Sequence, residues 1–240
     1  MDTPLPRRMQ HPDDRSEKMP PRPRGATQAP RLSLRPPRGM TVVAEPRLLD
    51  GDHREGEHYE RLTLDGRDLA GITLQECILD GVSLDDTELR GARFIECRIE
   101  DLFAPVFRAA RSSWRETSLR STRWGSAELY DSRFDGVHLD GGKLDYVNLR
   151  SSQLTDVLIS GCIIGELDLS GVKATRMALQ DCTLGTLTLD GAQLKEVDLR
   201  TSSFRTINGL DGLRGATVDD YQLQLLAPYL AESMGLRVEG

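Results

Sequence analysis

Few side chains in this sequence are of a type and spacing that could perform chemistry. Only one of the four histidines, His138, falls in the regular part of the chain, where Asp135 and Asp140 flank it and would suit it as a general base. The sequence contains no nucleophile with an orienting partner and no phosphate-loop, serine-hydrolase or zinc-peptidase signature. We therefore expect a protein that is not an enzyme and that has no catalytic residue and no cofactor.

The cysteines and the Asp-Gly dipeptides are the other candidates for chemistry. Cys77 and Cys97 lie one 20-residue step apart, as do Cys162 and Cys182. A metal site would need His or carboxylate partners that point the same way, and this spacing supplies none, so we expect buried free thiols and no metal site. The Asp-Gly pairs could hold calcium, but Gly after Asp favours a simple turn, which is our interpretation. These pairs are 80–81, 135–136, 140–141 and 190–191.

The elements that must position these residues follow a five-residue period. From Leu64 to Phe204 every fifth position is apolar without interruption, and small or aliphatic residues such as Val147 lie two positions earlier. The residue two positions later is glycine or mostly polar, as a chain corner requires. A period of five fits neither a helix nor an ordinary strand and predicts the coils of a solenoid.

The repeats also resemble a known family. Their sequences are similar to the loose motif Ala-(Asp/Asn)-Leu-X-X of the pentapeptide-repeat family over residues 62 to about 218. The resemblance implies an all-β fold, a right-handed quadrilateral parallel β-helix with four repeats in each coil. With neighbouring strands about 4.8 Å apart, about seven coils would form a rod of roughly 34 Å. The best-matching repeats are GARFI (91–95), VHLDG (137–141), VNLRS (147–151), LDLSG (167–171) and VDLRT (197–201).

Composition divides the chain into four parts. Residues 1–40 are rich in Pro and Arg and should be a disordered tail, although a basic arm for nucleic acid or lipid, or a true translation start at Met40, are alternatives. Residues 41–61 form a lead-in and N-terminal cap, 62–218 the β-helix, and 219–240 a C-terminal helical cap that begins at Asp219 and Asp220. The sequence has no apolar run that could cross a membrane and no apolar signal segment, so we expect a cytoplasmic protein.

Side chains at equivalent positions of successive coils should stack on one another. This places Ala104 beside Trp124, and Trp114 between Phe94 and Phe134, so that small and large residues compensate in volume. The segment 101–114 contains a proline, which cannot donate to a strand ladder, and could be a bulge or a protruding recognition loop. After Phe204 the period should slip by one residue.

The expected function is a rigid, non-enzymatic surface that binds another macromolecule, with the partner open. The family resemblance implies an alternative, a DNA-mimicking binder of a type II topoisomerase such as gyrase, which inhibits the enzyme or protects it against drugs or toxins. Residues 65–101 hold ten acidic and four basic residues, which favours a protein partner over direct nucleic acid binding. The predicted contact residues are Asp65, Asp68, Asp80, Asp85, Asp86 and Glu88.

The C-terminal helix should present two apolar faces. One stripe, Leu223, Leu226, Ala227, Leu230 and Met234, would cover the open end of the last coil. The second face holds Tyr221, Leu225 and Tyr229 and predicts a two-fold homodimer, as the resemblance to end-to-end paired members also implies. In the alternative, a bend at Pro228 buries both faces on the same solenoid.

Overall fold

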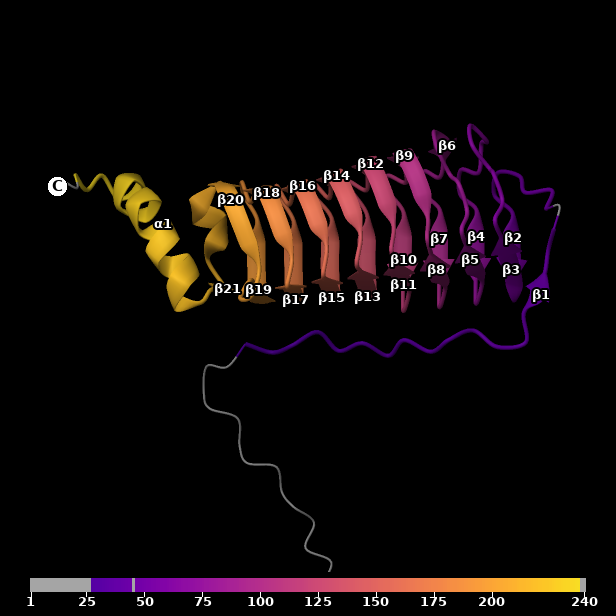
Figure 1. Cartoon of the computed structure of the whole chain (residues 1–240), viewed down its shortest axis with the longest axis horizontal. Helices are drawn as coiled ribbons and strands as arrows, with labels where there is room; N and C mark the ends of the chain where they lie inside the picture. Colours follow the sequence, from indigo (N-terminus) through magenta and orange to yellow (C-terminus); the bar gives the residue numbers. More distant parts are fainter. Residues whose placement is uncertain (1–26, 45, 238–240) are drawn as a thin grey trace, which may run out of the picture.

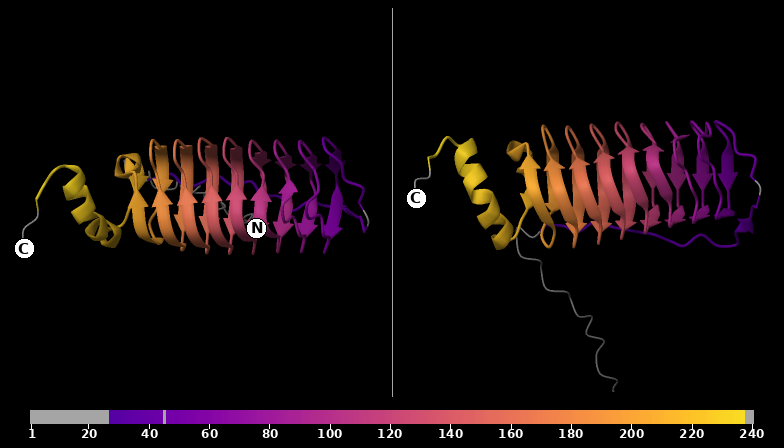
Figure 2. Two further views of the ribbon diagram at one scale, coloured as in Figure 1. Left: turned by 90° about the horizontal axis from the view of Figure 1, so that it is seen from above. Right: turned by 45° about the horizontal axis from the view of Figure 1, so that its top comes forward.

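The chain forms a parallel β-solenoid followed by one helix. The computed structural model describes residues 27–44 and 46–237. In Figure 1 the coils stack from β2 and β3 at one end to β20 at the other, and α1 (Asp220–Ser233) lies beyond the last coil. Figure 2 shows the same rod from two further directions, with its strands side by side and across the axis. The all-β solenoid expected from the five-residue period is therefore confirmed.

The strands belong to two sheets that enclose the core. The 14-stranded sheet consists of β1 (Thr41–Val42), β2 (His53–Glu55), β3 (Glu57–Glu60), β4 (Thr73–Gln75), β5 (Ile78–Asp80), β7 (Arg93–Ile95), β8 (Arg98–Glu100), β10 (Ser113–Arg115), β11 (Ser118–Arg120), β13 (Arg133–Asp140), β15 (Gln153–Ser160), β17 (Lys173–Gln180), β19 (Gln193–Asp198) and β21 (Ala216–Thr217). The 7-stranded sheet consists of β6 (Thr87–Glu88), β9 (Phe103–Arg108), β12 (Arg123–Glu128), β14 (Lys143–Asn148), β16 (Ile163–Asp168), β18 (Thr183–Thr188) and β20 (Ser203–Asn208).

Neighbouring coils pair in register, so that each residue lies opposite the equivalent position of the next coil. Trp114 lies opposite Phe94 on one side and Phe134 on the other, and Ala104 lies opposite Trp124. The Trp114 ring stacks on Phe94 with centroids 4.0 Å apart and on Phe134 with centroids 5.9 Å apart. Ala104 is fully buried beside the large indole, so the predicted volume compensation is present.

The segment 101–114 does not protrude. Its first half is the continuous strand β9, which pairs with β6 and β12, and its second half contains β10. Pro105 is accommodated at a corner where the next N–H, that of Val106, donates to the carboxylate of Asp85 at 2.9 Å. The interpretation of this segment as a recognition loop is therefore wrong. The chain stays in the coil because the Asp85 carboxylate accepts the Val106 N–H in place of the acceptor that a regular ladder would have provided.

The corners of the coil adopt left-handed backbone conformations, as the turn interpretation of the Asp-Gly pairs expects. Gly81, Gly136, Gly141 and Gly191 have φ angles between 65° and 68°. Glycine tolerates this region without strain, so these dipeptides serve as corners of the coil.

Ordered structure begins before the repeats. Within the segment expected to be a lead-in, β2 and β3 already pair in register with β4 and β5. Most of the predicted disordered tail, residues 1–26, lies outside the described residues. Residues 27–40 contain no helix or strand, but they run along the outside of the coil (Figure 1) instead of leaving it. Hydrogen bonds from their backbone to the coil explain this placement.

The C-terminal end contains the expected one-residue slip. In β21, Ala216 lies opposite Val197, where an unbroken coil would have placed Thr217, because the short 3-10 helix η1 (Leu210–Leu213) interrupts the coil. Helix α1 then starts with a capping box in which Asp219 and Gln222 bond each other's backbone N–H groups. Gly235, with a φ of 74°, follows the helix as expected.

The helix does not cover the coil end with the predicted stripe. Leu226 is buried, but Leu223 is 50% exposed and Met234 is 75% exposed. The anchor is instead polar, because Nε2 of Gln222 donates to the carbonyl oxygens of Leu199 and Ser202, both at 2.6 Å. Periodicity could not reveal this, since it does not show that a glutamine reaches the unpaired carbonyls of the last coil.

Candidate functional site

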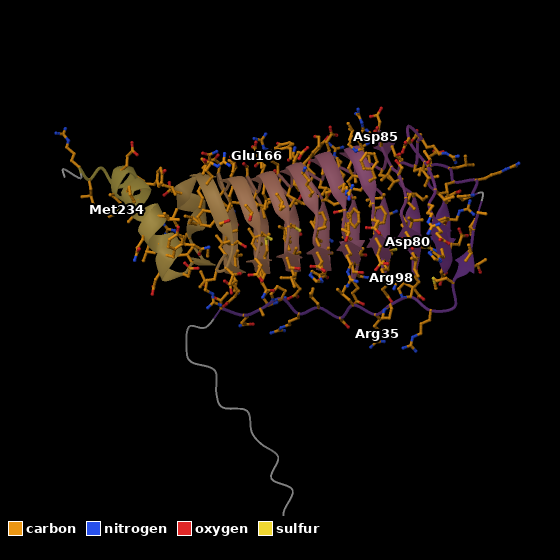
Figure 3. The ribbon with its side chains drawn as sticks, in the orientation of Figure 1. Arg35, Asp80, Asp85, Arg98, Glu166 and Met234 are labelled. Atoms are coloured by element: carbon orange, nitrogen blue, oxygen red, sulfur yellow. The ribbon has the colours of Figure 1, made fainter. Side chains whose placement is uncertain are left out.

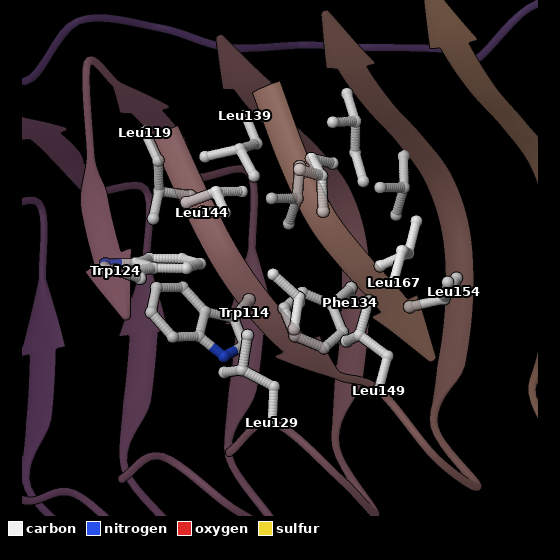
Figure 4. A pocket seen from close by; sticks show the side chains of 15 residues that line it. Trp114, Leu119, Trp124, Leu129, Phe134, Leu139, Leu144, Leu149, Leu154 and Leu167 are labelled. Carbon is white, nitrogen blue, oxygen red and sulfur yellow. The ribbon is translucent and has the colours of Figure 1, made fainter. Parts of the chain in front are cut away.

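The interior of the coil offers no site for polar chemistry. It contains a cavity of about 40 Å³ lined only by apolar side chains, among them Trp114, Trp124 and Leu149 (Figure 4). The side chains that line it include no titratable or metal-ligating group. Any function that uses charge must therefore lie on the outer faces.

His138 belongs to a hydrogen-bonded chain on the outside of β13 and β15. Its Nε2 lies 2.8 Å from Oγ of Ser160, and that hydroxyl donates to Oδ1 of Asp140 at 2.8 Å. Burial lowers the pKa of His138, and Asp140 opposes this shift. Because the serine proton is directed to Asp140, the imidazole does not remove it, and the order of groups differs from that of a nucleophile activated by histidine.

The cysteines are buried free thiols. Sγ of Cys97 donates to the carbonyl oxygen of Leu74 at 3.2 Å, and Sγ of Cys182 donates to that of Ile159 at 3.4 Å. Burial raises the pKa of Cys97 to about 12, which disfavours the reactive thiolate. Among residues 27–44 and 46–237, no group of three or more His, Cys, Asp or Glu side chains could hold a metal ion.

The six predicted contact residues do not form one surface. The backbone of Asp68 forms a parallel β-bridge with that of Glu88, and Glu88 lies on β6, so both residues belong to the edge formed with the smaller sheet. Asp80 ends β5 in the larger sheet, and Figure 3 shows it well below Asp85. Spacing by fives predicts that all six face outward but not which corner each occupies.

Three of these carboxylates, those of Asp65, Asp85 and Asp86, have structural partners, and Asp85 accepts the N–H of Val106. Oδ1 of Asp65 accepts hydrogen bonds from Oγ of Ser83 (2.6 Å) and from the N–H of Asp85 (2.9 Å). Asp86 forms an ion pair with Nε of Arg108 at 2.6 Å, and it raises the pKa of this guanidinium. Asp68 and Glu88 bond only the backbone two residues ahead, and Arg90 lies 3.9 Å from Glu88. On the edge formed with the smaller sheet, Asp68 and Glu88 are therefore the predicted residues best placed to meet a partner.

A second acidic surface follows a corner of the larger sheet. Its carboxylates occupy the same position in different coils, and each of these residues has a positive φ. We call this set the acidic ridge: Glu76, Glu96, Glu116, Asp156 and Glu196. Stepping through the sequence from Glu76 by one coil at a time would have revealed it, whereas counting charges along the chain does not.

Residues 27–40 lie along the acidic ridge. The N–H of Gln28 donates to Oε2 of Glu196 at 2.7 Å, and the N–H of Arg31 donates to Oδ1 of Asp156 at 2.9 Å. Arg176 binds the same Asp156 with Nε and Nη2, both at 2.6 Å. This pairing is the largest cause of the lowered pKa of Asp156.

The predicted dimer residues are exposed. Tyr221 is 68%, Leu225 48% and Tyr229 57% exposed. Leu225 and Tyr229 border a hollow beside Phe204 and Ile207 of the last coil. The helix thus leaves apolar surface uncovered next to a partly open coil end.

In the part of the chain that the structure describes, no helix has both the length and the apolar character needed to cross a membrane.

A family model and several solved structures are similar to parts of this chain. Residues 68–101 match the family model described as pentapeptide repeats (8 copies). No curated protein sequence matches the chain. A trypsin-treated variant of QnrB1, a plasmid-mediated fluoroquinolone resistance protein, is 17% identical with a TM-score of 0.42, and the match covers 84% of this chain and 100% of that one.

A second solved structure is HetL, a pentapeptide repeat protein involved in heterocyst differentiation regulation from the cyanobacterium Nostoc. It is 19% identical with a TM-score of 0.28, and the match covers 72% of this chain and 92% of that one. Neither likeness is close enough to transfer a function. Residues 68–101 thus match a model of pentapeptide repeats, and the same coil-to-coil register continues beyond them.

Proposed function

We propose that this protein is a non-enzymatic, rigid scaffold that binds another macromolecule through its outer faces, in the cytoplasm. One observation carries the proposal: the inward positions form a continuous apolar core, while charged side chains collect in stacks along the outer corners. A parallel ladder fixes such stacks at intervals of about 4.8 Å and presents them without the entropy cost of ordering loops.

Affinity capture with matched surface variants tests this role. Asp68→Lys/Glu88→Lys changes two exposed or half-exposed carboxylates, and Gln153→Lys changes an exposed residue of the other sheet. We expect a cytoplasmic partner that the wild type and Gln153→Lys retain and the double variant loses, and that binds again when purified components are mixed. Equal retention by all three proteins would contradict a partner at this edge.

A DNA-mimicking binder of a type II topoisomerase such as gyrase is the second candidate. The observation that favours it is the group Asp68, Asp85, Asp86 and Glu88, which places carboxylates of adjacent levels on one edge. Arg108 reduces the negative potential there. A supercoiling assay with purified gyrase decides it: inhibition or drug protection at about micromolar protein, an affinity of about −8 kcal/mol, is expected, and the absence of both would exclude this candidate.

The exposed helix supports a proposal of homodimerisation through α1. A two-fold contact would use one patch on both chains and bury Tyr221, Leu225 and Tyr229, which are each about half exposed or more. Sedimentation equilibrium of the wild type should give a dimer, and Leu225→Glu should give a monomer. Gln224→Glu, on the exposed side of the same helix, is the matched control. A monomeric wild type would refute the interface.

A further inference from the structure

The segment 27–40, which we call the strap, follows the acidic ridge along the rod. Thr27 contacts Thr217 near the C-terminal end through their hydroxyls, Gln28 binds Glu196 and Arg31 binds Asp156. At the other end β1 continues the strap and pairs with β3. Fourteen extended residues span roughly 43 Å at about 3.1 Å per residue, which matches the nine steps of about 4.8 Å from β21 to β1.

The strap has two sides that alternate along the chain. Leu32 and Leu34 are half-buried, whereas Arg31, Ser33 and Arg35, which alternate with them, are exposed. Pro30 and Pro37 are half-buried as well. This period of two is that of an extended chain lying with one side on a surface. The strap therefore binds the coil as a peptide would, with its apolar side chains toward the coil.

The charges of the strap and the ridge are opposite. Arg35 and Arg38 border the same hollow as Glu76 and Glu96 (Figure 3 labels Arg35 beneath the coil). Farther along, the bidentate Arg176 pair holds the Asp156 carboxylate in place to accept the strap N–H. A basic, proline-containing segment thus meets carboxylates that the coil holds at fixed levels.

These contacts do not depend on covalent continuity with the coil. The two carboxylates accept main-chain N–H groups, which every residue except proline provides, and half-buried leucines supply the apolar side. An unconnected segment with the same alternation could make the same contacts. The strap competes better than an unconnected segment, because its short connection to the coil gives it an effective concentration of about millimolar at the acidic ridge.

We propose that the acidic ridge is a binding surface for an extended, arginine-containing polypeptide with apolar residues at alternate positions, and that the strap occupies this surface in cis until such a partner segment replaces it. The proposal deepens the scaffold function and rests on it, because it names the chemistry of one partner. It is independent of gyrase and of the edge that carries Asp68 and Glu88.

A labelled peptide with the sequence of residues 27–41 is the probe, and fluorescence anisotropy is the measurement. The full chain is compared with Leu32→Glu/Leu34→Glu, which places two charges on the inward side of the strap, and with the control Ser33→Glu, which places one on the outward side. We expect the double variant to bind the peptide about 100-fold more tightly than the wild type, since the tethered strap competes at about millimolar effective concentration. Ser33→Glu should resemble the wild type.

Adding Glu76→Lys/Glu96→Lys to the double variant should weaken peptide binding at least about tenfold, because it reverses the charge opposite Arg35 and Arg38. Cleavage by trypsin after Arg38 reports release of the strap, and circular dichroism confirms an intact coil. A released strap without peptide binding, an unreleased strap in Leu32→Glu/Leu34→Glu, or equal binding by the wild type would each overturn the proposal. The peptide probe contains no gyrase or lysate, so failure here and failure of the scaffold function remain distinguishable.

Discussion

Enlarging Ala104 should destabilise the coil because Trp124 already fills the space beside it. Ala104 is fully buried and Trp124 is 4% exposed. The two residues face each other in the β9–β12 ladder, and the Trp124 ring stacks on Phe107 at 4.9 Å with an angle of 7° between the planes. Ala104→Leu adds three carbon atoms at a site where the indole cannot shift without losing this stacking.

The structure allows the magnitudes to be estimated. Overpacking of this kind costs about 1–3 kcal/mol, and Trp124→Ala alone costs about 3–5 kcal/mol through lost burial and a cavity. In the double variant the new leucine fills part of the space that the indole leaves. The combined loss should therefore be about 0.5–3 kcal/mol smaller than the sum of the single losses.

Chemical denaturation followed by circular dichroism measures the four corners of this cycle. The matched control is Ala174→Leu, at an equally buried alanine between Leu154 and Leu194, combined with the same Trp124→Ala. Ala174 is more than two coils from Trp124, about 12 Å along the axis, so its effect should add to that of Trp124→Ala. Additive losses for Ala104 and Trp124 would refute the volume argument.

Three further predictions concern the core, a corner and a carboxylate. Leu149→Asp should lower the free energy of unfolding by more than about 3 kcal/mol, because it places a desolvated carboxylate in the apolar core. Asn148→Asp in the same repeat should leave the stability almost unchanged. Thermal unfolding of both variants measures this, and equal stability would contradict the inward position of Leu149. Gly165→Ala should lower the unfolding midpoint more than Gly141→Ala. A Cβ at 165 would lie 2.4 Å from the carbonyl oxygen of Asp145, whereas a Cβ at 141 would contact no atom and adds only the strain of a positive φ. A smaller loss of stability at 165 would show that the backbone there can shift. Asp156→Asn should destabilise the protein at about pH 7 and have little effect on its stability at about pH 2. The hydrogen bond from Arg176 lowers the folded pKa of Asp156, so the stabilisation by this carboxylate is complete above the unfolded pKa of about 3.9 and disappears as pH falls through the folded pKa. A difference in unfolding midpoint that stays constant between these pH values would exclude this linkage.

The sequence was sufficient to determine the coil. Each centre residue and its small neighbour point inward because the five-residue period leaves them no other common side, and the length of one coil then fixes which residues stack. The stack of Phe94, Trp114 and Phe134 and the slip at Ala216 were predicted for this reason and are present. Local patterns suffice here because each coil repeats the same geometry.

The contact surfaces were harder to predict, because they depend on which corner a side chain occupies. Six acids that are close in sequence lie on different sides of the coil, with Asp80 on the larger sheet and Glu88 on the smaller one, while Glu76 and Glu196, far apart in sequence, join one ridge. Linear charge counts average over all four sides of a coil, so they mix residues that never meet.

The two ends were decided only by the tertiary structure. The strap has the composition of a disordered tail, and the coil supplies what it lacks alone, namely carboxylates for its N–H groups and a surface for Leu32 and Leu34. Likewise Gln222, a polar residue without periodic significance, anchors α1 by reaching two carbonyl oxygens of the last coil. Sequence periodicity determines how a repeat contacts its own copies, but contacts between a non-repeating segment and the rod depend on hydrogen-bonding groups that become neighbours only after the rod has formed.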